Sequence, residues 1–262
     1  MKELIFITGA SGNLGYEIFK NFQKKYKIIG TYYKNKKRLL YKLDLSNLKD
    51  TKKFLKNRKP DIVLHLSAFT NPSLNEKFKN KSKRYNVNTT KNLINSISNK
   101  TKFIFFSTDK VYFYKKNKKI YSENSFCKSN LTYAKNKIIC ENMIRRKFKE
   151  HVILRLPIIH SNGNKNNFSF LDNCMINLKR KKKVTVFSDT FRSFVDIKQL
   201  IELLKKLLKS NVKGTYNIGS KKFSYYTRLK LICKKLKINY RGLLISSTSN
   251  LKDKHLALST KK

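Results

Sequence analysis

The stretch of sequence that decides the fold is Leu4–Tyr16, which reads LIFITGASGNLGY. Its apolar start, ending in Thr-Gly, is typical of a buried parallel strand, and the amphipathic run Leu14–Phe22 predicts the first helix. Glycines occupy the turn between them. Gly9 permits the tight turn, Gly12 lets the backbone approach a pyrophosphate, and Gly15 lets helix and strand pack closely. The stretch therefore predicts a dinucleotide-binding site.

Strand and helix patterns alternate from this stretch to residue 110. Strands are expected at residues 26–33, 59–68 and 102–109, and helices are expected to open near residue 46 and at residue 86. The alternation predicts an α/β fold with a doubly wound, Rossmann-like parallel sheet. Ligands of such sheets bind beyond the carboxyl ends of the strands, where Gly12, Ala68 and Thr108 fall. His65 lies within a strand pattern and is expected to be a core histidine.

Size and charge limit the function classes. The 262 residues are enough for one α/β domain with a smaller appended lobe. The 61 Lys+Arg against 15 Asp+Glu give a net charge of +46, which would ordinarily suggest a nucleic acid or an anionic membrane as partner. The lysines are spread over nearly every segment, so we expect weak, salt-sensitive association with polyanions and no specific nucleic-acid site.

The cysteines and the apolar runs indicate the compartment. Cys127, Cys140, Cys174 and Cys233 form no C-x-x-C pair, and the histidines show no ligand spacing, so neither disulfides nor a metal site are expected. The glycine turn breaks the first apolar run at once, and no stretch approaches the length of a membrane span. We therefore expect no signal peptide, no membrane segment and a cytoplasmic location.

The second strand bears on the choice of cofactor. Sites that prefer NAD place an acidic residue there for the ribose 2′-hydroxyl, and this chain has none. Thr31 and the cations of the run 34–38 would instead accommodate the 2′-phosphate of NADP. Lysine is so common in this chain that chance explains the cluster almost as well, so the pattern only leans toward NADP (NADPH) over NAD.

Tyr133 and Lys137 share one face of an expected helix at residues 133–141. Reducing a ketone requires a proton on oxygen as hydride reaches carbon, and Tyr133 would supply it. An isolated tyrosine titrates at about 10, so Lys137 would lower that pKa while also holding the nicotinamide ribose. Thr108 would orient the carbonyl by a hydrogen bond. The alternative is a chance Tyr–Lys pair on the surface, but the glycine turn, the hydroxyl-ended strand and the Tyr/Lys helix follow one another in an order that resembles the short-chain reductases.

The glycine spacing and the Tyr/Lys helix resemble the short-chain dehydrogenase/reductase superfamily. Within it, the segments 107–112 (STDKVY), 133–141 and 154–157 (LRLP) resemble the dTDP-4-dehydrorhamnose reductase group of extended members, as do 60–63 (PDIV) and 68–71 (AFTN). The resemblance implies NAD(P)H-dependent reduction of a nucleotide 4-keto-6-deoxy sugar in surface polysaccharide biosynthesis, and it leaves room for a homodimer.

The resemblance also implies a set of site residues. The catalytic residues are Thr108, Tyr133 and Lys137. The cofactor-binding residues are Gly9, Ser11, Gly12, Asn13, Leu14, Gly15, Thr31, Asp44, Leu45, Leu66, Ser67, Ala68, Asn86, Tyr133, Lys137 and Pro157, with Asp44 and Leu45 at the adenine. The substrate-binding residues are Thr70, Thr108, Asp109, Asn167, Phe168 and Arg192.

Departures from the group's pattern keep other functions open. The loop at Asn71–Ser73 lacks the group's acidic residue, and 189–196 (DTFRSFVD) looks like the wider epimerase/dehydratase family, in which Arg192 would contact the nucleotide diphosphate. Arg192 could also be one more surface cation. An epimerase or dehydratase that recycles bound NAD is therefore an alternative. A second is a non-catalytic NADP-binding regulatory subunit like that of methionine adenosyltransferase.

We expect two domains. Residues 1–160 would form the NAD(P)-binding domain and residues 161–262 a smaller substrate-binding lobe, with the helix 195–210 packing back on the first domain. Residues 247–261 resemble the loop that closes over substrate in the family. The family usually continues into one more short helix, so we expect the lobe to be shortened after Lys262.

Overall fold

The computed structural model describes residues 3–112, 120–161, 169–250 and 255–260. The chain forms two compact units, and neither is continuous in sequence. The first comprises residues 1–113, 126–155 and 210–216, and the second comprises residues 114–125, 156–209 and 217–262. The two units are described separately below.

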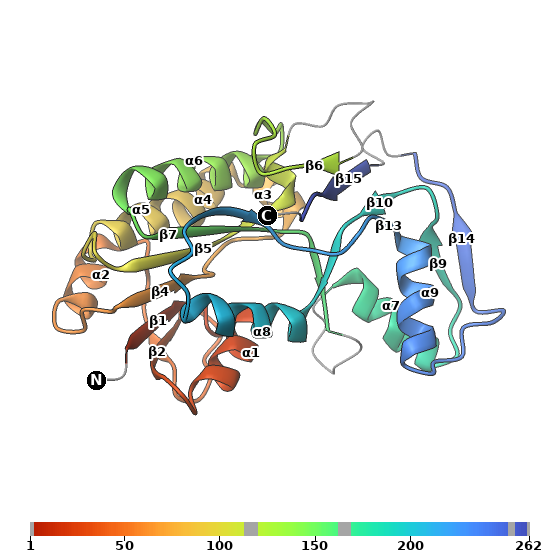
Figure 1. The fold of residues 1–262 in the computed structure, drawn as a ribbon, viewed down its shortest axis with the longest axis horizontal. Coiled ribbons are helices and arrows are strands. Elements are labelled where there is room, and N and C mark those ends of the chain that lie inside the picture. The colour runs from red at the N-terminus through yellow and green to blue at the C-terminus, as the bar shows by residue number, and fades with distance from the viewer. Residues whose placement is uncertain (1–2, 113–119, 162–168, 251–254, 261–262) are drawn as a thin grey trace. The chain divides into compact units, whose positions relative to one another are not determined.

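A seven-stranded sheet with the order β12-β7-β5-β4-β1-β2-β3 forms the centre of the first unit (Figure 1). Its strands are β1 (Leu4–Thr8), β2 (Lys27–Tyr32), β3 (Tyr41–Lys42), β4 (Ile62–His65), β5 (Lys102–Thr108), β7 (His151–Leu156) and β12 (Gly214–Asn217). β1 pairs in parallel with both β2 and β4, and β4 pairs in parallel with β5. Because the strand order reverses between β1 and β4, this is a doubly wound sheet, and the predicted fold class is confirmed.

Helices cover both faces of this sheet (Figure 1). They are α1 (Asn13–Phe22), α2 (Leu48–Leu55), α3 (Pro72–Lys77), α4 (Lys79–Lys83), the π-helical turn η1 (Arg84–Asn88), α5 (Thr89–Ile94), the short helix η2 (Asp109–Val111) and α6 (Thr132–Lys147). α1 lies on one face, and α5 and α6 lie on the other. Phe6, Phe103 and Phe105 of the strands pack there with Leu93 and Cys140 of the helices. Burial on both faces explains why the strands are almost continuous apolar runs.

The second unit consists of short strands and three helices among its described residues. These are β6 (Ile120–Tyr121), β8 (Ile158–His160), α7 (Phe170–Lys179), β9 (Val184–Phe187), β10 (Phe191–Arg192), β11 (Phe194–Asp196), α8 (Ile197–Leu208), β13 (Phe223–Ser224), α9 (Tyr225–Lys235), β14 (Leu244–Ser247) and β15 (His255–Leu258). The strands form sheets with the orders β13-β10-β15-β6, β11-β8 and β14-β9. A separate core lies between α7, α9 and β9.

Two elements of the second unit differ from the sequence expectation. The helix expected from residue 195 begins at Ile197, because Phe194–Asp196 pairs in parallel with Ile158–His160. The segment 247–261, expected to be a closing loop, contains the strand β15, which pairs with β10 and β6, and its first residue ends β14, which pairs with β9. Backbone pairing with distant strands decides both cases.

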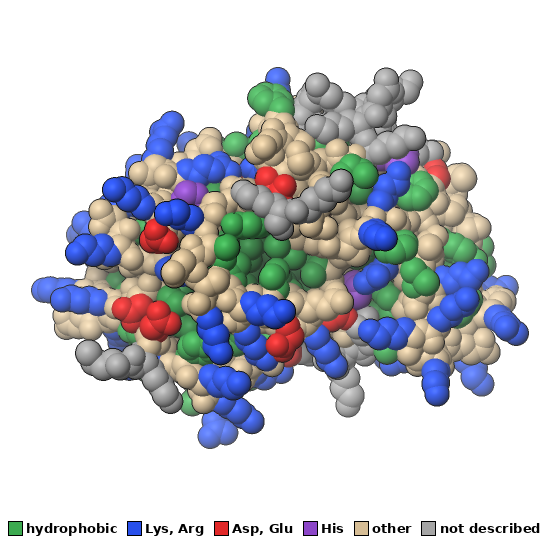
Figure 2. Space-filling model, in the orientation of Figure 1, with side chains coloured by type: hydrophobic (Ala, Val, Ile, Leu, Met, Phe, Trp, Pro, Cys, Tyr) green, Lys and Arg blue, Asp and Glu red, His purple; other side chains and the backbone are tan. Residues whose placement is uncertain are grey.

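Lysine and arginine side chains are scattered over the visible surface and do not gather in one patch (Figure 2), which agrees with their even spread along the sequence. Within the described ranges, no helix is both long and apolar enough to cross a bilayer.

Candidate active site

The turn between β1 and α1 has the geometry that its glycines predict. Gly9 has a positive φ of 65°, and a Cβ there would lie 2.8 Å from the backbone nitrogen of Ser67. A Cβ on Gly15 would lie 2.3 Å from the carbonyl oxygen of Gly9, so the close packing of helix on strand requires glycine at this position. Gly12 is the N-cap of α1, and as a glycine it has no side chain that could cap the helix. The start of α1 is therefore shaped to accept an anion.

The end of β4 lies against this turn. The Ser67 N–H donates to the Thr8 hydroxyl (3.2 Å), which contacts Nδ1 of His65 at 2.7 Å. Nε2 of His65 contacts Thr90 at 2.9 Å, and burial lowers the pKa of this histidine to about 3. His65 is thus the neutral core histidine that the sequence predicts. Leu66, Ser67 and Ala68 follow it partly exposed at the carboxyl edge of the sheet.

Asn86 lies in the middle of a π-helical turn and does not open a helix as expected. Its buried side chain accepts a hydrogen bond from the Phe69 N–H (2.8 Å) and donates to the Phe69 carbonyl (3.2 Å). Asn75, Ser82 and Asn136 complete a buried polar cluster around it. Asn86 therefore holds the segment after β4 in place. The sequence did not indicate the cluster, because asparagine and serine are common throughout the chain.

The end of β2 and the segment after β3 carry the residues expected near the adenosine. Thr31 is buried, with its hydroxyl 3.5 Å from the Ile7 carbonyl oxygen, whereas the cations of the run 34–38 are exposed. Asp44 accepts the Ser46 N–H at 2.8 Å, and Leu45 is buried in the core. The Arg84 guanidinium lies 4.0 Å from the Asp44 carboxylate. Sequence reasoning missed Arg84, which is hidden among many other cations.

Thr108, Tyr133 and Lys137 come from two adjacent elements of the first unit. Thr108 ends β5, and its hydroxyl accepts the Lys110 N–H and donates to Asp109, both at 3.3 Å. Tyr133 is the second residue of α6, and Lys137 lies one turn further on. The Lys137 ammonium lies 5.8 Å from the centre of the Tyr133 ring and donates to the Phe106 carbonyl at 2.8 Å. The expected Tyr–Lys adjacency is therefore present, next to the end of the strand that carries Thr108.

The electrostatics of the pair differ from the expectation. Burial raises the pKa of Tyr133 above its ordinary value, and the Asp109 carboxylate raises it further. Burial lowers the pKa of Lys137 to about 8. The expected depression of the Tyr133 pKa is wrong for this structure, because burial and the Asp109 carboxylate raise that pKa, while the Lys137 ammonium donates to the Phe106 carbonyl. The phenol is consequently protonated at neutral pH.

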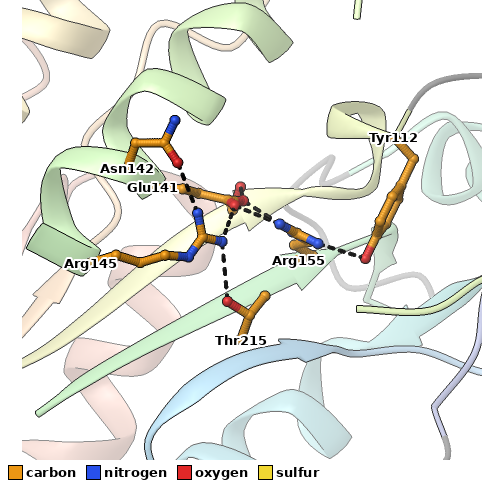
Figure 3. Close-up of polar contacts among 7 residues, drawn as sticks. Tyr112, Glu141, Asn142, Arg145, Arg155 and Thr215 are labelled. Atoms are coloured by element: carbon orange, nitrogen blue, oxygen red, sulfur yellow. Dashed lines mark hydrogen bonds and ion pairs between the residues drawn. The ribbon is translucent and has the colours of Figure 1, made fainter. Parts of the chain in front are cut away.

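A buried ionic network supports the end of β5 (Figure 3). The Glu141 carboxylate accepts hydrogen bonds from Ser107 (2.6 Å), from Arg145 (2.7 Å) and twice from Arg155 (3.1 and 2.7 Å). Arg155 also donates to the Tyr112 hydroxyl at 2.9 Å. Burial opposes ionisation of Glu141, but these donors hold its pKa below the ordinary value. The network ties α6 to the residue before Thr108.

The remaining expected site residues come from several parts of the chain. Thr70 is exposed after β4, and Asp109 is buried beside Thr108 in the first unit. Pro157 and Arg192 belong to the second unit, where Arg192 donates to the Phe191 carbonyl at 3.1 Å. Asn167 and Phe168 lie outside the described residues.

A doubly wound sheet with a glycine turn, and with a Tyr–Lys pair beside a hydroxyl-ended strand, places the chain among the extended short-chain dehydrogenase/reductases. The chain belongs to the family described as RmlD substrate binding domain, whose model matches residues 1–253. The resemblance predicted from the sequence is confirmed.

The sequence identity to individual relatives is low. The chain is 26% identical over 218 residues to the spore coat polysaccharide biosynthesis protein SpsK of Bacillus subtilis, which is 82% of this chain and 73% of that protein. It is 25% identical over 161 residues to methionine adenosyltransferase 2 subunit beta of Xenopus tropicalis, covering 61% of this chain and 48% of that one. Its fold is similar to that of a Bacillus anthracis dTDP-4-dehydrorhamnose reductase in complex with NADP, with a TM-score of 0.84 and 20% identity over 100% of this chain and 92% of that chain.

Proposed function

We propose that this protein reduces the 4-keto group of a nucleotide 4-keto-6-deoxy sugar with NAD(P)H in polysaccharide biosynthesis. The observation that carries the proposal is the placement of Tyr133 and Lys137 on α6 beside Thr108 at the end of β5. Family membership, the reductase of similar fold and the relative from Bacillus subtilis, a polysaccharide biosynthesis protein, support the substrate class.

The glycine turn fits a nicotinamide dinucleotide. A side chain on Gly9 or Gly15 would collide with neighbouring backbone, and the start of α1 favours a pyrophosphate at that point. The segment 66–68 would line the path toward the nicotinamide, and Asp44 would bind the adenine. The bound cofactor would supply the hydride.

The side chains of this chain would supply the proton and the orientation. The Thr108 hydroxyl would hold the substrate carbonyl, and the Tyr133 phenol would give its proton to the carbonyl oxygen. The raised pKa of Tyr133 keeps that proton in place at neutral pH until the oxygen becomes basic. Lys137 would place its positive charge beside the phenolate that forms and hold the ribose. Thr70 and Asp109 of the first unit would contact the substrate, and the substrate contacts expected of Asn167, Phe168 and Arg192 remain predictions.

We favour NADP over NAD as the cofactor. The end of β2 has no acidic residue to bind a free ribose 2′-hydroxyl, and exposed cations follow at residues 34–38. Arg84, beside Asp44, is a further cation of the adenosine region. A charge-assisted bond to the 2′-phosphate is worth about 1.5–3 kcal/mol.

Two observations keep other functions in view. The segment 189–196 resembles epimerases and dehydratases, which would not consume the cofactor. The similarity to methionine adenosyltransferase 2 subunit beta is compatible with a binding subunit that has no turnover. One assay separates the three, since only a reductase consumes NADPH stoichiometrically.

The test is a panel of dTDP- and GDP-4-keto-6-deoxy sugars offered to the purified protein with NADPH and, separately, with NADH. We expect one sugar to be reduced with matching loss of NADPH absorbance, and NADPH to bind more tightly than NADH at moderate salt. Product formed without loss of NADPH would indicate an epimerase. Binding of NADPH without turnover of any sugar would indicate a regulatory subunit.

A further inference from the structure

The helix that carries Tyr133 begins without a cap of its own. Leu131, the N-cap of α6, makes no capping bond with its side chain, and the helix's first turn, which is fully described, contains no acidic residue. Three other helices are capped by the side chain of their own N-cap residue: α2 by Asn47, α7 by Ser169 and α9 by Ser224. The start of α6 therefore depends on a partner from outside the helix.

That partner is Glu76 near the end of α3. One of its carboxylate oxygens accepts the Thr132 N–H at 2.6 Å, and the other accepts the Thr132 hydroxyl at 2.7 Å. Glu76 thus binds both the backbone and the side chain of Thr132, the residue before Tyr133. The two bonds hold the pKa of Glu76 below its ordinary value, although the side chain is exposed. A carboxylate at a helix N-terminus is also favoured by the helix dipole.

α3 itself is anchored to the segment after β4. The Asn75 side chain donates to the Phe69 carbonyl at 2.9 Å and to the Asn71 carbonyl at 2.6 Å. Phe69 is in turn held on both its backbone groups by Asn86. Glu76 therefore joins the segment that contains Thr70 to the first turn of the helix that contains Tyr133.

We propose that Glu76 is a positioning residue that sets the place of the Tyr133 hydroxyl by clamping Thr132, without touching substrate or cofactor. The proposal rests on the ketoreductase function proposed above. Without Glu76, the first turn of α6 could shift and carry Tyr133 with it. A small displacement of a catalytic group lowers the reaction rate, because the group must lie within hydrogen-bonding distance of the reacting oxygen. The clamp should therefore act on the chemical step and leave cofactor binding unchanged.

The test compares Glu76→Gln and Glu76→Ala with the wild type and with Glu202→Gln. Glu202 is the matched control, because it is 64% exposed and pairs only with Lys205 on its own helix among the contacts described. We expect kcat for the 4-keto sugar to fall about tenfold or more in Glu76→Ala and less in Glu76→Gln. The KM and Kd for NADPH should stay within about twofold, as should every constant of Glu202→Gln.

The partner residue provides a second arm. Thr132→Ser keeps both groups that Glu76 binds and should retain kcat, whereas Thr132→Val removes only the hydroxyl and should lose part of it. Because Glu76 and Thr132 act as a unit, the double variant Glu76→Ala/Thr132→Val should be little worse than Glu76→Ala alone. Additive losses would overturn the clamp.

Hydrogen exchange provides a readout that does not need activity. The peptide that contains the first turn of α6 should exchange faster in Glu76→Ala than in wild type or in Glu202→Gln. Faster exchange with unchanged kcat would overturn the positioning role, and unchanged exchange would overturn the clamp itself. A wild type that binds NADPH but reduces no 4-keto sugar would refute the proposed function, and with it any effect of the clamp on turnover.

Discussion

The glycine turn after β1 and the first turn of α6 are built in opposite ways. The glycine turn is formed by the backbone. At Gly9 and Gly15 the neighbouring backbone lies so close that any residue with a Cβ would collide with it. The first turn of α6 is held by a side chain distant in sequence, Glu76 on Thr132, and further along the helix Glu141 ties α6 to Ser107 of β5. A site built on local backbone can be read from its spacing, whereas one held by distant side chains cannot.

The largest effect should come from removing the proton donor. Tyr133→Phe keeps the ring and should lower ketoreductase turnover by about 10²–10⁴-fold, the usual contribution of general acid catalysis, with NADPH affinity almost unchanged. Tyr216→Phe is the control, since that hydroxyl bonds the Lys213 carbonyl. Steady-state kinetics and NADPH titration measure both. Near-wild-type turnover in Tyr133→Phe would remove Tyr133 from the catalytic role.

The region around α6, which is held by distant side chains, should be sensitive to the loss of its buried charge. Glu141 is 1% exposed and Arg155 is 3% exposed, so Glu141→Ala would leave a buried guanidinium without its anion. We expect a loss of about 3–5 kcal/mol in the free energy of unfolding. The exposed pair of Glu202 and Lys205 gives the comparison, and Glu202→Ala should cost less than about 1 kcal/mol. Equal losses in denaturant unfolding would show that the network does not support the fold.

The glycine turn offers a test that separates the cost of backbone strain from the cost of a steric collision. Gly9 and Gly242 both have positive φ, of 65° and 69°, but a Cβ at Gly242 would meet nothing within 4 Å. Gly242→Ala should therefore cost only the strain of the backbone, about 1–2 kcal/mol. Gly9→Ala should cost more in thermal unfolding, because its Cβ also meets Ser67, and should weaken NADPH binding. If both variants lose the same stability, the close approach at Gly9 has no energetic weight.

The smallest effect concerns the pH dependence of Lys137. Its pKa of about 8 in the folded chain lies below the ordinary lysine value of about 10.4. Between these values the unfolded chain binds a proton that the folded chain lacks, so this group makes stability rise as pH rises across that window. If catalysis needs the ammonium, kcat/KM should fall as pH rises through about 8.

The pH profile of Lys137→Arg sharpens this assignment. Arginine stays charged, so the fall near pH 8 should move to higher pH in this variant even if its rate is lower. Circular dichroism checks that the variant is folded. A fall at the same pH in both proteins would assign it to a group other than Lys137. Tyr133 is not expected to produce it, because the pKa of that phenol is raised.

Sequence by itself determined the doubly wound sheet, the glycine turn and the adjacency of Tyr133 and Lys137. These features depend on local rules: an apolar run buried on both faces becomes a central strand, glycine permits a positive φ, and residues four apart lie on one face of a helix. The burial of His65 was predictable for the same reason, since it lies within a strand pattern. Each of these features is signalled by residues that lie close together in the sequence, although the strands themselves pair with partners that are distant along the chain.

Tertiary structure alone decided how Tyr133 and Lys137 are held in place and how their pKa values are shifted. The pKa of Tyr133 is raised because folding takes the phenol out of water and brings Asp109 near, while Lys137 donates to the Phe106 carbonyl. Glu76 and Thr132 meet across 56 positions of sequence, and Ser107 and Glu141 meet across 34. In a chain with 61 basic residues, no pattern distinguishes the few charges that folding buries or pairs from those that remain in water, because burial and pairing are properties of the packed chain.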